Sequence, residues 1–186
     1  MTAPTRVWTW EDALKLPDGE RYEVINGELK ERTMSYRSSE IASIFVELLR
    51  AWARAHQPGR VTGSDGGFTI FPWTAGDVRM PDAAYISKER LPRSPARGWV
   101  SVAPELTVEV ISPNDLFSDA EDKAKDYIRA GVDLVWVVVP NSRSVHIWRR
   151  DGSRSIVQAG EMLSGEDVLP GFAVPVAELF EEETED

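Results

Sequence analysis

The stretch LTVEVIS, residues 106–112, has the pattern of a buried strand with one acidic residue inside it. Side chains alternate between the two faces of a strand, so Glu109 shares a face with Thr107 and Ile111. The opposite face is apolar and carries Leu106, Val108 and Val110. Burying a carboxylate is costly unless it is paired or binds a metal ion. Glu109 is therefore expected to have a cationic partner.

The segments that follow this strand predict the fold around it. A helix is expected over 118–130, and DLVWVVV, residues 133–139, has no polar residue after Asp133. Such a run is typical of an interior strand that is covered on both faces. A strand, a helix and a second strand predict a parallel neighbour reached by a crossover. We predict an α/β (α+β) fold, with a mixed central sheet flanked by helices.

Other elements surround this unit. Apolar residues at helical spacing predict a helix over 38–56, and short strands are expected near 60–63, 67–71 and 82–86. Two dipeptides, Asn26-Gly27 and Asp151-Gly152, lie between alternating segments and favour two-residue hairpin turns. They predict one hairpin near each end of the chain.

Length and composition indicate one domain without disulfides. The chain has 186 residues, which suits one domain over 1–180, followed by an acidic, frayed tail at 181–186. It contains no cysteine, so thiolate metal sites are excluded. The net charge of −10 argues against a broad basic surface for nucleic acid, although a local basic groove remains compatible with it. The N-terminal segment has no apolar signal core, so we expect a cytoplasmic protein without membrane contact.

A second acidic residue lies at the start of a neighbouring strand. Pro81-Asp82 precedes small and apolar residues, and Glu109 lies further along the chain. Two carboxylates on adjacent strands can hold a hard divalent cation together with a backbone carbonyl and waters. Alternatively, Asp82 begins a turn and Glu109 pairs with an arginine near a sheet edge.

Five further segments are informative as a set: RYEVINGELKE at 21–31, VRMPDAAYIS at 78–87, PELTVEVISPND at 104–115, KAKDYIRAGVDLVWVVVP at 123–140 and LPGFAVPVAELF at 169–180. Together they resemble the Uma-two family of bacterial proteins, which is expected to have the restriction-endonuclease-like fold of the PD-(D/E)XK nuclease superfamily. The resemblance covers nearly the whole chain in the expected order. It implies a metal-dependent phosphodiesterase core that uses Mg2+ or Mn2+.

The resemblance also implies roles for particular residues. Asp82 and Glu109 match the metal-binding acids, and the main-chain carbonyl of Ile111 is a further expected ligand. Ile111 occupies the position where the superfamily has a lysine, and Lys123 matches the lysine that replaces it in the family. Glu23 matches a family acid that faces the same cleft.

The first long helix departs from the family pattern. Many relatives have a histidine at its start, where this chain has Ser38, Ser39 and Glu40. Glu40 is a candidate for the first-helix acid of several nucleases in the superfamily.

Helix geometry separates the two lysines of the 118–130 helix. Lys123 lies on the flank of the expected buried stripe, whereas Lys125 lies further towards solvent. A flanking lysine can extend its ammonium over a strand end. Without the family pattern, the spacing favours a solvated helix in which Lys123 is an ordinary surface charge.

Two functions are compatible with these features. The first is a magnesium-dependent endonuclease acting on nucleic acid, with DNA as the expected substrate; a homodimer is compatible with it. The second is a catalytically inactive nuclease-fold protein that serves as an assembly or regulatory module. Arg90, Arg93 and Arg97 form the most basic loop, which would either touch a phosphate backbone or be solvated. The sequence assigns no nucleic-acid-binding residue.

Overall fold

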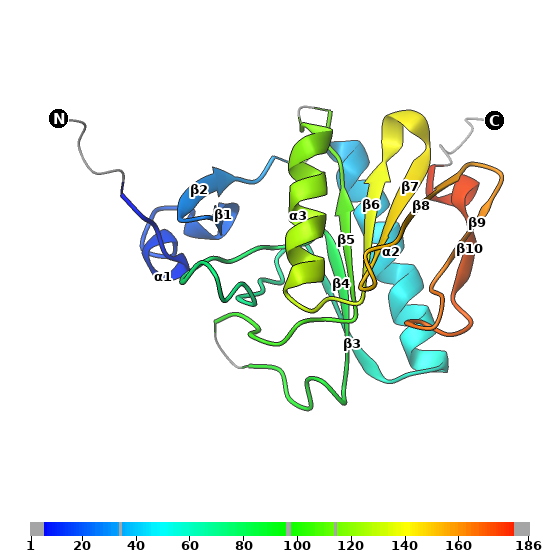
Figure 1. The fold of residues 1–186 in the computed structure, drawn as a ribbon, viewed down its shortest axis with the longest axis horizontal. Helices are drawn as coiled ribbons and strands as arrows, with labels where there is room; N and C mark the ends of the chain where they lie inside the picture. Colours follow the sequence, from blue (N-terminus) through cyan, green and yellow to red (C-terminus); the bar gives the residue numbers. More distant parts are fainter. Residues whose placement is uncertain (1–5, 34, 96–97, 114, 181–186) are drawn as a thin grey trace.

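The centre of the molecule is a six-stranded mixed sheet with the strand order β3-β4-β5-β6-β7-β8 (Figure 1). A computed structural model describes residues 6–33, 35–95, 98–113 and 115–180. The helices are α1 (Trp10–Ala13), α2 (Tyr36–Ala55) and α3 (Phe117–Arg129), and short 3-10 turns span Gly19–Arg21, Pro140–Ser142 and Val176–Phe180. The strands are β1 (Tyr22–Ile25), β2 (Glu28–Glu31), β3 (Gly59–Gly63), β4 (Ala83–Ser87), β5 (Leu106–Val110), β6 (Leu134–Val139), β7 (Ser144–Arg149), β8 (Arg154–Gln158), β9 (Met162–Ser164) and β10 (Ala173–Pro175).

Strands β5 and β6 form the interior of the sheet, as the sequence predicts. They pair in parallel, with Glu109 opposite Val137. The other pairs in this sheet are antiparallel. Residues 134–138 are all buried, because apolar side chains cover both faces of β6. The predicted mixed sheet is therefore confirmed.

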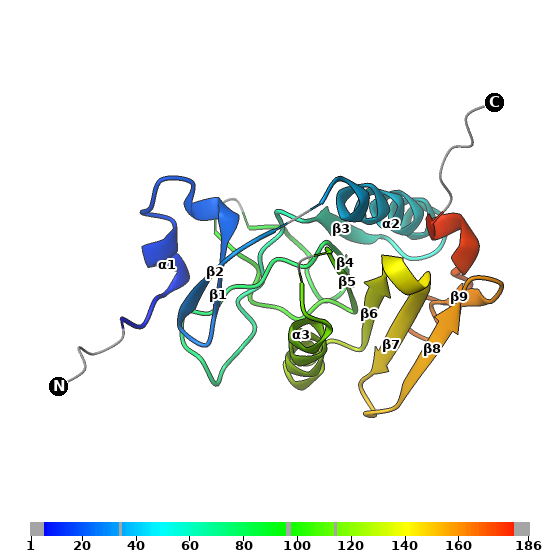
Figure 2. The ribbon, with the colours of Figure 1, turned by 90° about the horizontal axis from the view of Figure 1, so that it is seen from above.

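Two helices cover opposite faces of this sheet (Figure 2). Helix α2 packs with the apolar face of β5 that carries Val108. Helix α3 connects β5 to β6 and packs its buried stripe, which includes Ala124 and Tyr127, on the other face. Glu109 belongs to this second face, so the alternation in β5 turns its side chain towards α3.

The N-terminal hairpin lies outside the main sheet. Strands β1 and β2 pair through a turn at Asn26 and Gly27, which have φ values of 53° and 74°. These left-handed values are the ones that a two-residue hairpin turn of this type requires. Asp77 accepts the main-chain N–H groups of both turn residues, at 2.7 and 3.1 Å. A single bridge between Val24 and Val78 attaches the hairpin to the segment before β4. The hairpin prediction is confirmed.

The prediction of a strand at 67–71 is wrong. Phe68 forms only isolated bridges, to Arg79 and to Val100. The neighbouring Gly67 lets the backbone pass close to Trp99, since a β-carbon at position 67 would lie 2.5 Å from the Trp99 ring. The segment therefore follows a path set by tertiary contacts, which strand propensity does not report.

Two further predictions concern the ends of the chain and the membrane. The predicted C-terminal hairpin is formed by β7 and β8, which extend the main sheet. The acidic tail at 181–186 lies outside the described residues. Within the part of the chain that is described, no helix has the length and apolar character needed to cross a membrane.

Candidate active site

Asp82 and Glu109 come together because β4 and β5 pair in antiparallel register. Ala83 lies opposite Val108, so one step further along the register places Asp82 opposite Glu109. Directly opposed residues in such a pair are close neighbours on the same face. The Asp82 carboxylate also accepts the main-chain N–H of Val110 at 2.7 Å, which holds it at the end of β5.

Helix α3 supplies two partners for the Glu109 carboxylate, which is 7% exposed. The hydroxyl of Tyr127 donates to Glu109 Oε1 at 3.0 Å, and Lys123 Nζ lies 3.3 Å from Oε2. Lys123 and Tyr127 are one helical turn apart, so both reach the same side of α3. Glu109 thus has the cationic partner that its burial requires, and the partner is a lysine rather than an arginine.

Glu23 on β1 completes the ion-pair cluster. Its side chain is 3% exposed, and its Oε2 lies 2.7 Å from Lys123 Nζ. Glu23 Oε1 accepts the main-chain N–H of Met80 at 2.7 Å, just before Pro81-Asp82. The hairpin therefore contacts both the lysine and the segment that carries Asp82.

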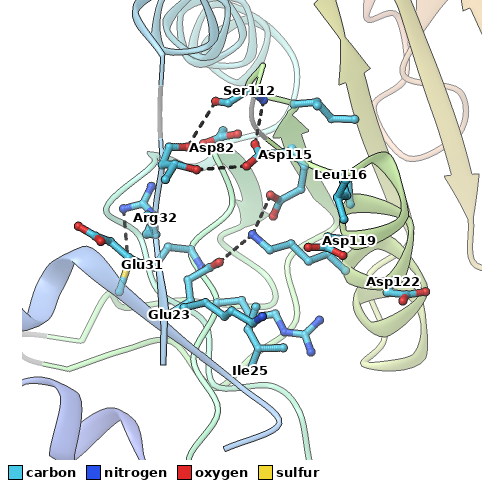
Figure 3. Close-up of a pocket in the computed structure, with 18 of the residues that line it drawn as sticks. Glu23, Ile25, Glu31, Arg32, Asp82, Ser112, Asp115, Leu116, Asp119 and Asp122 are labelled. Atoms are coloured by element: carbon cyan, nitrogen blue, oxygen red, sulfur yellow. Dashed lines mark hydrogen bonds and ion pairs between the residues drawn. The ribbon is translucent and has the colours of Figure 1, made fainter. Parts of the chain in front are cut away.

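A cavity of about 430 Å³ between the hairpin and α3 is lined by Glu23, Asp82, Glu109 and Lys123 (Figure 3). The view shows Glu23 and Ile25 on one side and Asp82 with Ser112 at the far end. Leu116 lies just before α3, and Asp119 and Asp122 lie along it. The lining contains nine acidic and four basic side chains. The cavity is therefore an acidic environment in which Lys123 lies between Glu23 and Glu109.

Burial and mutual repulsion shift the titration of the acidic residues. Desolvation raises the pKa of Glu109 to about 7, against the opposing attraction of Lys123 and with a further rise from Asp82. Desolvation also raises the pKa of Asp82 to about 6, although the hydrogen bond from Val110 opposes this. The neighbouring carboxylates raise the pKa of Lys123 above its usual value despite burial, so Lys123 stays cationic at neutral pH.

Of the other residues expected at the site, Ile111 lies in the cavity lining and Glu40 does not. Ile111 lines the cavity, and its N–H donates to the carbonyl of Val138, so its backbone is fixed at the strand end. Glu40 is exposed and pairs with Arg37 at 2.6 Å on α2, and the cavity lining does not include it. Ser38 occupies the start of that helix, where its hydroxyl bonds to Ser112 at 2.8 Å.

Neither alternative for the basic loop describes Arg90. Its guanidinium pairs with Glu105 at 3.2 Å and with Asp133, so it ties the loop to the ends of β5 and β6. Arg93 is exposed, and Arg97 lies outside the described residues. The sequence pattern did not reveal the role of Arg90 because its acidic partners are distant in the chain.

Arg79 is a cavity residue that the sequence pattern did not single out. It is fully buried, pairs with Asp126 of α3 at 2.6 Å, and stacks over the Phe71 ring at 4.3 Å. Its only sequence signal is an arginine between Val78 and Met80, both of which are buried. Through Asp126, Arg79 fixes the helix that carries Lys123 and Tyr127.

The site offers two carboxylates as possible ligands of a hard divalent cation. Within the described ranges, no group of three or more histidine, cysteine, aspartate or glutamate side chains is arranged to hold a metal. Mg2+ keeps several waters and is usually bound through one or two carboxylates. Asp82 and Glu109 offer two such groups, and burial together with their mutual repulsion raises the pKa of both carboxyls.

Comparisons with known proteins agree with this architecture. The chain is similar to the crystal structure of a "putative nuclease belonging to DUF820" from Anabaena variabilis ATCC 29413. The TM-score is 0.78 at 20% identity, over 92% of this chain and 97% of the other, which shows a shared fold. No curated protein matches the chain. The family model Uma2, described as "Putative restriction endonuclease", matches residues 10–177. The chain therefore belongs to the Uma2 family.

Proposed function

We propose that this protein is a divalent-metal-dependent endonuclease that hydrolyses phosphodiester bonds in nucleic acid, with DNA as the expected substrate. The observation that carries the proposal is the position of Lys123 Nζ, 2.7 Å from Glu23 and 3.3 Å from Glu109, in the cavity that Asp82 also lines. Two carboxylates and one fixed cation are the groups that metal-assisted phosphodiester hydrolysis needs. Membership of the Uma2 family supports the same reaction class.

Asp82 and Glu109 are the proposed ligands of Mg2+ or Mn2+, together with the main-chain carbonyl of Ile111. A divalent ion held there supplies charge neutralisation and a more acidic bound water. The Val110 N–H and the Tyr127 hydroxyl each hold one carboxylate in place. Because these donors fix the two side chains beforehand, the ligand oxygens need little reorganisation.

Lys123 is the proposed catalytic cation. Its raised pKa keeps the ammonium protonated, so it donates hydrogen bonds and does not act as a general base. A fixed ammonium stabilises the negative charge that develops on the phosphate oxygens and positions the attacking water. Glu23 holds this ammonium in place, and we assign it a positioning role in the catalytic cluster. Ile111 supplies no cation, and Lys123 is the lysine that pairs with Glu23 and Glu109.

Incubation with nucleic acids tests this function. Purified protein is mixed with single-stranded, duplex and branched DNA and with RNA, in magnesium, in manganese and in a chelator. We expect metal-dependent cleavage by the wild type and none by Asp82→Ala. Glu47→Ala, which removes an exposed acid of α2 that does not line the cavity, is the matched control and should cleave normally. Wild-type protein that cleaves none of these substrates would support the non-catalytic alternative.

A further inference from the structure

The hairpin side of the cavity carries a positive group besides Lys123. Arg32, the residue after β2, lines the cavity, and its side chain is 15% exposed. Its Nη1 lies 3.8 Å from the sulfur of Met80, two residues before Asp82. Desolvation raises the pKa of Asp82, and the charge of Arg32 is one of the influences that oppose this rise. Arg32 therefore lies near the Asp82 end of the proposed site (Figure 3).

The burial of Arg32 has little compensation from the protein. Among the described residues, its one carboxylate partner is Asp65, which is 98% exposed and lies 3.6 Å away. That separation exceeds the length of a hydrogen bond, and an ion pair with an exposed partner contributes little. The sulfur of Met80 is a weak acceptor. The guanidinium thus keeps N–H donors that no carboxylate in the described ranges accepts.

Two other cations that line the cavity are held by the protein itself. Arg79 lies 2.6 Å from Asp126, and Lys123 lies 2.7 Å from Glu23. Each of these pairs is at hydrogen-bond length and leaves the cation with a carboxylate partner. Arg32 differs from both, because it is nearly as buried as they are and lacks such a pair.

A second cation lies beside Arg32 on the hairpin. Lys30 is exposed and lines the same cavity. The pairing of β1 with β2 continues to Arg32, whose N–H donates to the carbonyl of Arg21 at 2.9 Å. Side chains two residues apart on an extended chain share a face, so Lys30 and Arg32 lie along one side of the hairpin. Of the two acids at this wall, Glu31 pairs with Arg21 at 3.0 Å.

On the basis of the proposed function, we propose that Arg32, with Lys30 beside it, binds a second phosphate of the nucleic-acid strand, next to the phosphate that is cleaved at Lys123. The planar fork of a guanidinium matches the oxygens of a phosphate, and a phosphate supplies the partner that Asp65 does not. Contacts to phosphates position a strand without reading its bases. Arg32 would thus set which phosphodiester lies at the proposed metal ligands.

The salt dependence of binding tests this proposal. Fluorescence anisotropy in magnesium, recorded before any strand is cut, measures the affinity for a labelled oligonucleotide as a single strand and as a duplex. We expect Arg32→Ala to weaken binding about tenfold. The slope of log affinity against log salt should become shallower by about 0.7 for the single strand or about 0.9 for the duplex. Arg32→Lys keeps the charge and should keep the slope.

Arg21→Ala is the matched control, because it also removes one positive charge from the hairpin and Arg21 does not line the cavity. It should keep the wild-type slope. Thermal melts should show that Arg32→Ala retains stabilisation by magnesium, since Asp82 and Glu109 remain. Equal affinities and slopes for Arg32→Ala and Arg21→Ala would overturn the inference, as would loss of the magnesium effect in Arg32→Ala.

A gel of the same samples reports cleavage separately. Cleavage by Arg32→Ala with the wild-type KM would overturn the inference and leave the nuclease proposal standing. Uncut probes together with the expected change in slope would support the inference and contradict the nuclease proposal.

Discussion

The ammonium of Lys123 lies 2.7 Å from the carboxylate of Glu23, which joins α3 to the N-terminal hairpin. The same Glu23 side chain accepts the N–H of Met80, two residues before Asp82. The hairpin lies outside the central sheet. Through Glu23 it nevertheless contacts Lys123, the proposed catalytic cation, and the segment that carries Asp82, a proposed metal ligand. This relationship makes Glu23 the connection between the hairpin and the site.

Replacing Glu23 by alanine should destabilise the protein and disturb the site. The change leaves the buried N–H of Met80 without its acceptor, which costs about 1–3 kcal/mol of unfolding free energy. Glu23→Gln keeps an acceptor oxygen and should recover much of this loss while losing the ion pair with Lys123. Urea unfolding measures both variants. Glu31→Gln, which removes an exposed ion pair with Arg21, should change the free energy by less than about 1 kcal/mol. A Glu23→Ala protein as stable as Glu31→Gln would contradict the role of Glu23.

Magnesium or manganese should stabilise the fold, because an ion that binds only the native state raises the unfolding free energy. At a concentration 100 times the dissociation constant, the gain is about 2.7 kcal/mol. Thermal melts with and without metal measure it. We expect Asp82→Asn to lose this gain and Asp122→Asn to keep it. An equal shift in Asp82→Asn and wild type would remove Asp82 from the ligand set.

The stability of the metal-free protein should fall as the pH rises from about 4 to about 7. The folded-state pKa values of Asp82 and Glu109, about 6 and about 7, exceed the ordinary values of 3.8 and 4.5. The native state therefore holds protons that the unfolded chain has already released. Their contribution is complete below the unfolded values and is lost as the pH rises through the folded ones. Unfolding free energies across this range should show a flatter slope in the double variant Asp82→Asn/Glu109→Gln. Equal slopes in the wild type and the double variant would mean that Asp82 and Glu109 do not cause the pH dependence of stability.

Removing the Tyr127 hydroxyl should expose the cost of burying Glu109. In Tyr127→Phe the carboxylate loses its 3.0 Å donor, so the unfolding free energy should fall by about 1–3 kcal/mol. In the wild type, the hydrogen bond from Tyr127 lowers the pKa of Glu109. The variant lacks this bond, so the pKa of Glu109 should be higher in the variant than in the wild type. Guanidinium unfolding at neutral pH checks the first effect. Tyr36→Phe, at an exposed position, is the control and should stay within about 0.5 kcal/mol of wild type.

Local patterns predicted the parts of this fold that local physics determines. The alternation around Glu109 indicated its face, and the apolar run at 134–139 indicated the interior strand, because burial on one or two faces leaves a direct periodic signal. The turn at Asn26-Gly27 was predictable because few residue types adopt positive φ.

Contacts between distant segments could not be predicted in this way. Arg90 and Arg79 each reach acids on other elements, and these partly buried pairs leave no periodic pattern in the sequence. The pairing of Glu23 with Lys123 likewise follows from how the hairpin packs against α3. Family resemblance suggested that these two residues share a site, whereas spacing alone favoured an ordinary surface charge at Lys123.

The most direct test compares Lys123→Ala with Lys125→Ala in two assays on the same preparations. Lys123 is the cation between Glu23 and Glu109, whereas Lys125 is 47% exposed and pairs with Asp122. We predict that Lys123→Ala abolishes cleavage and retains stabilisation by magnesium, because the ligand carboxylates remain. Lys125→Ala should keep both properties. Cleavage by Lys123→Ala at the wild-type rate would contradict the assignment of Lys123 as the catalytic cation.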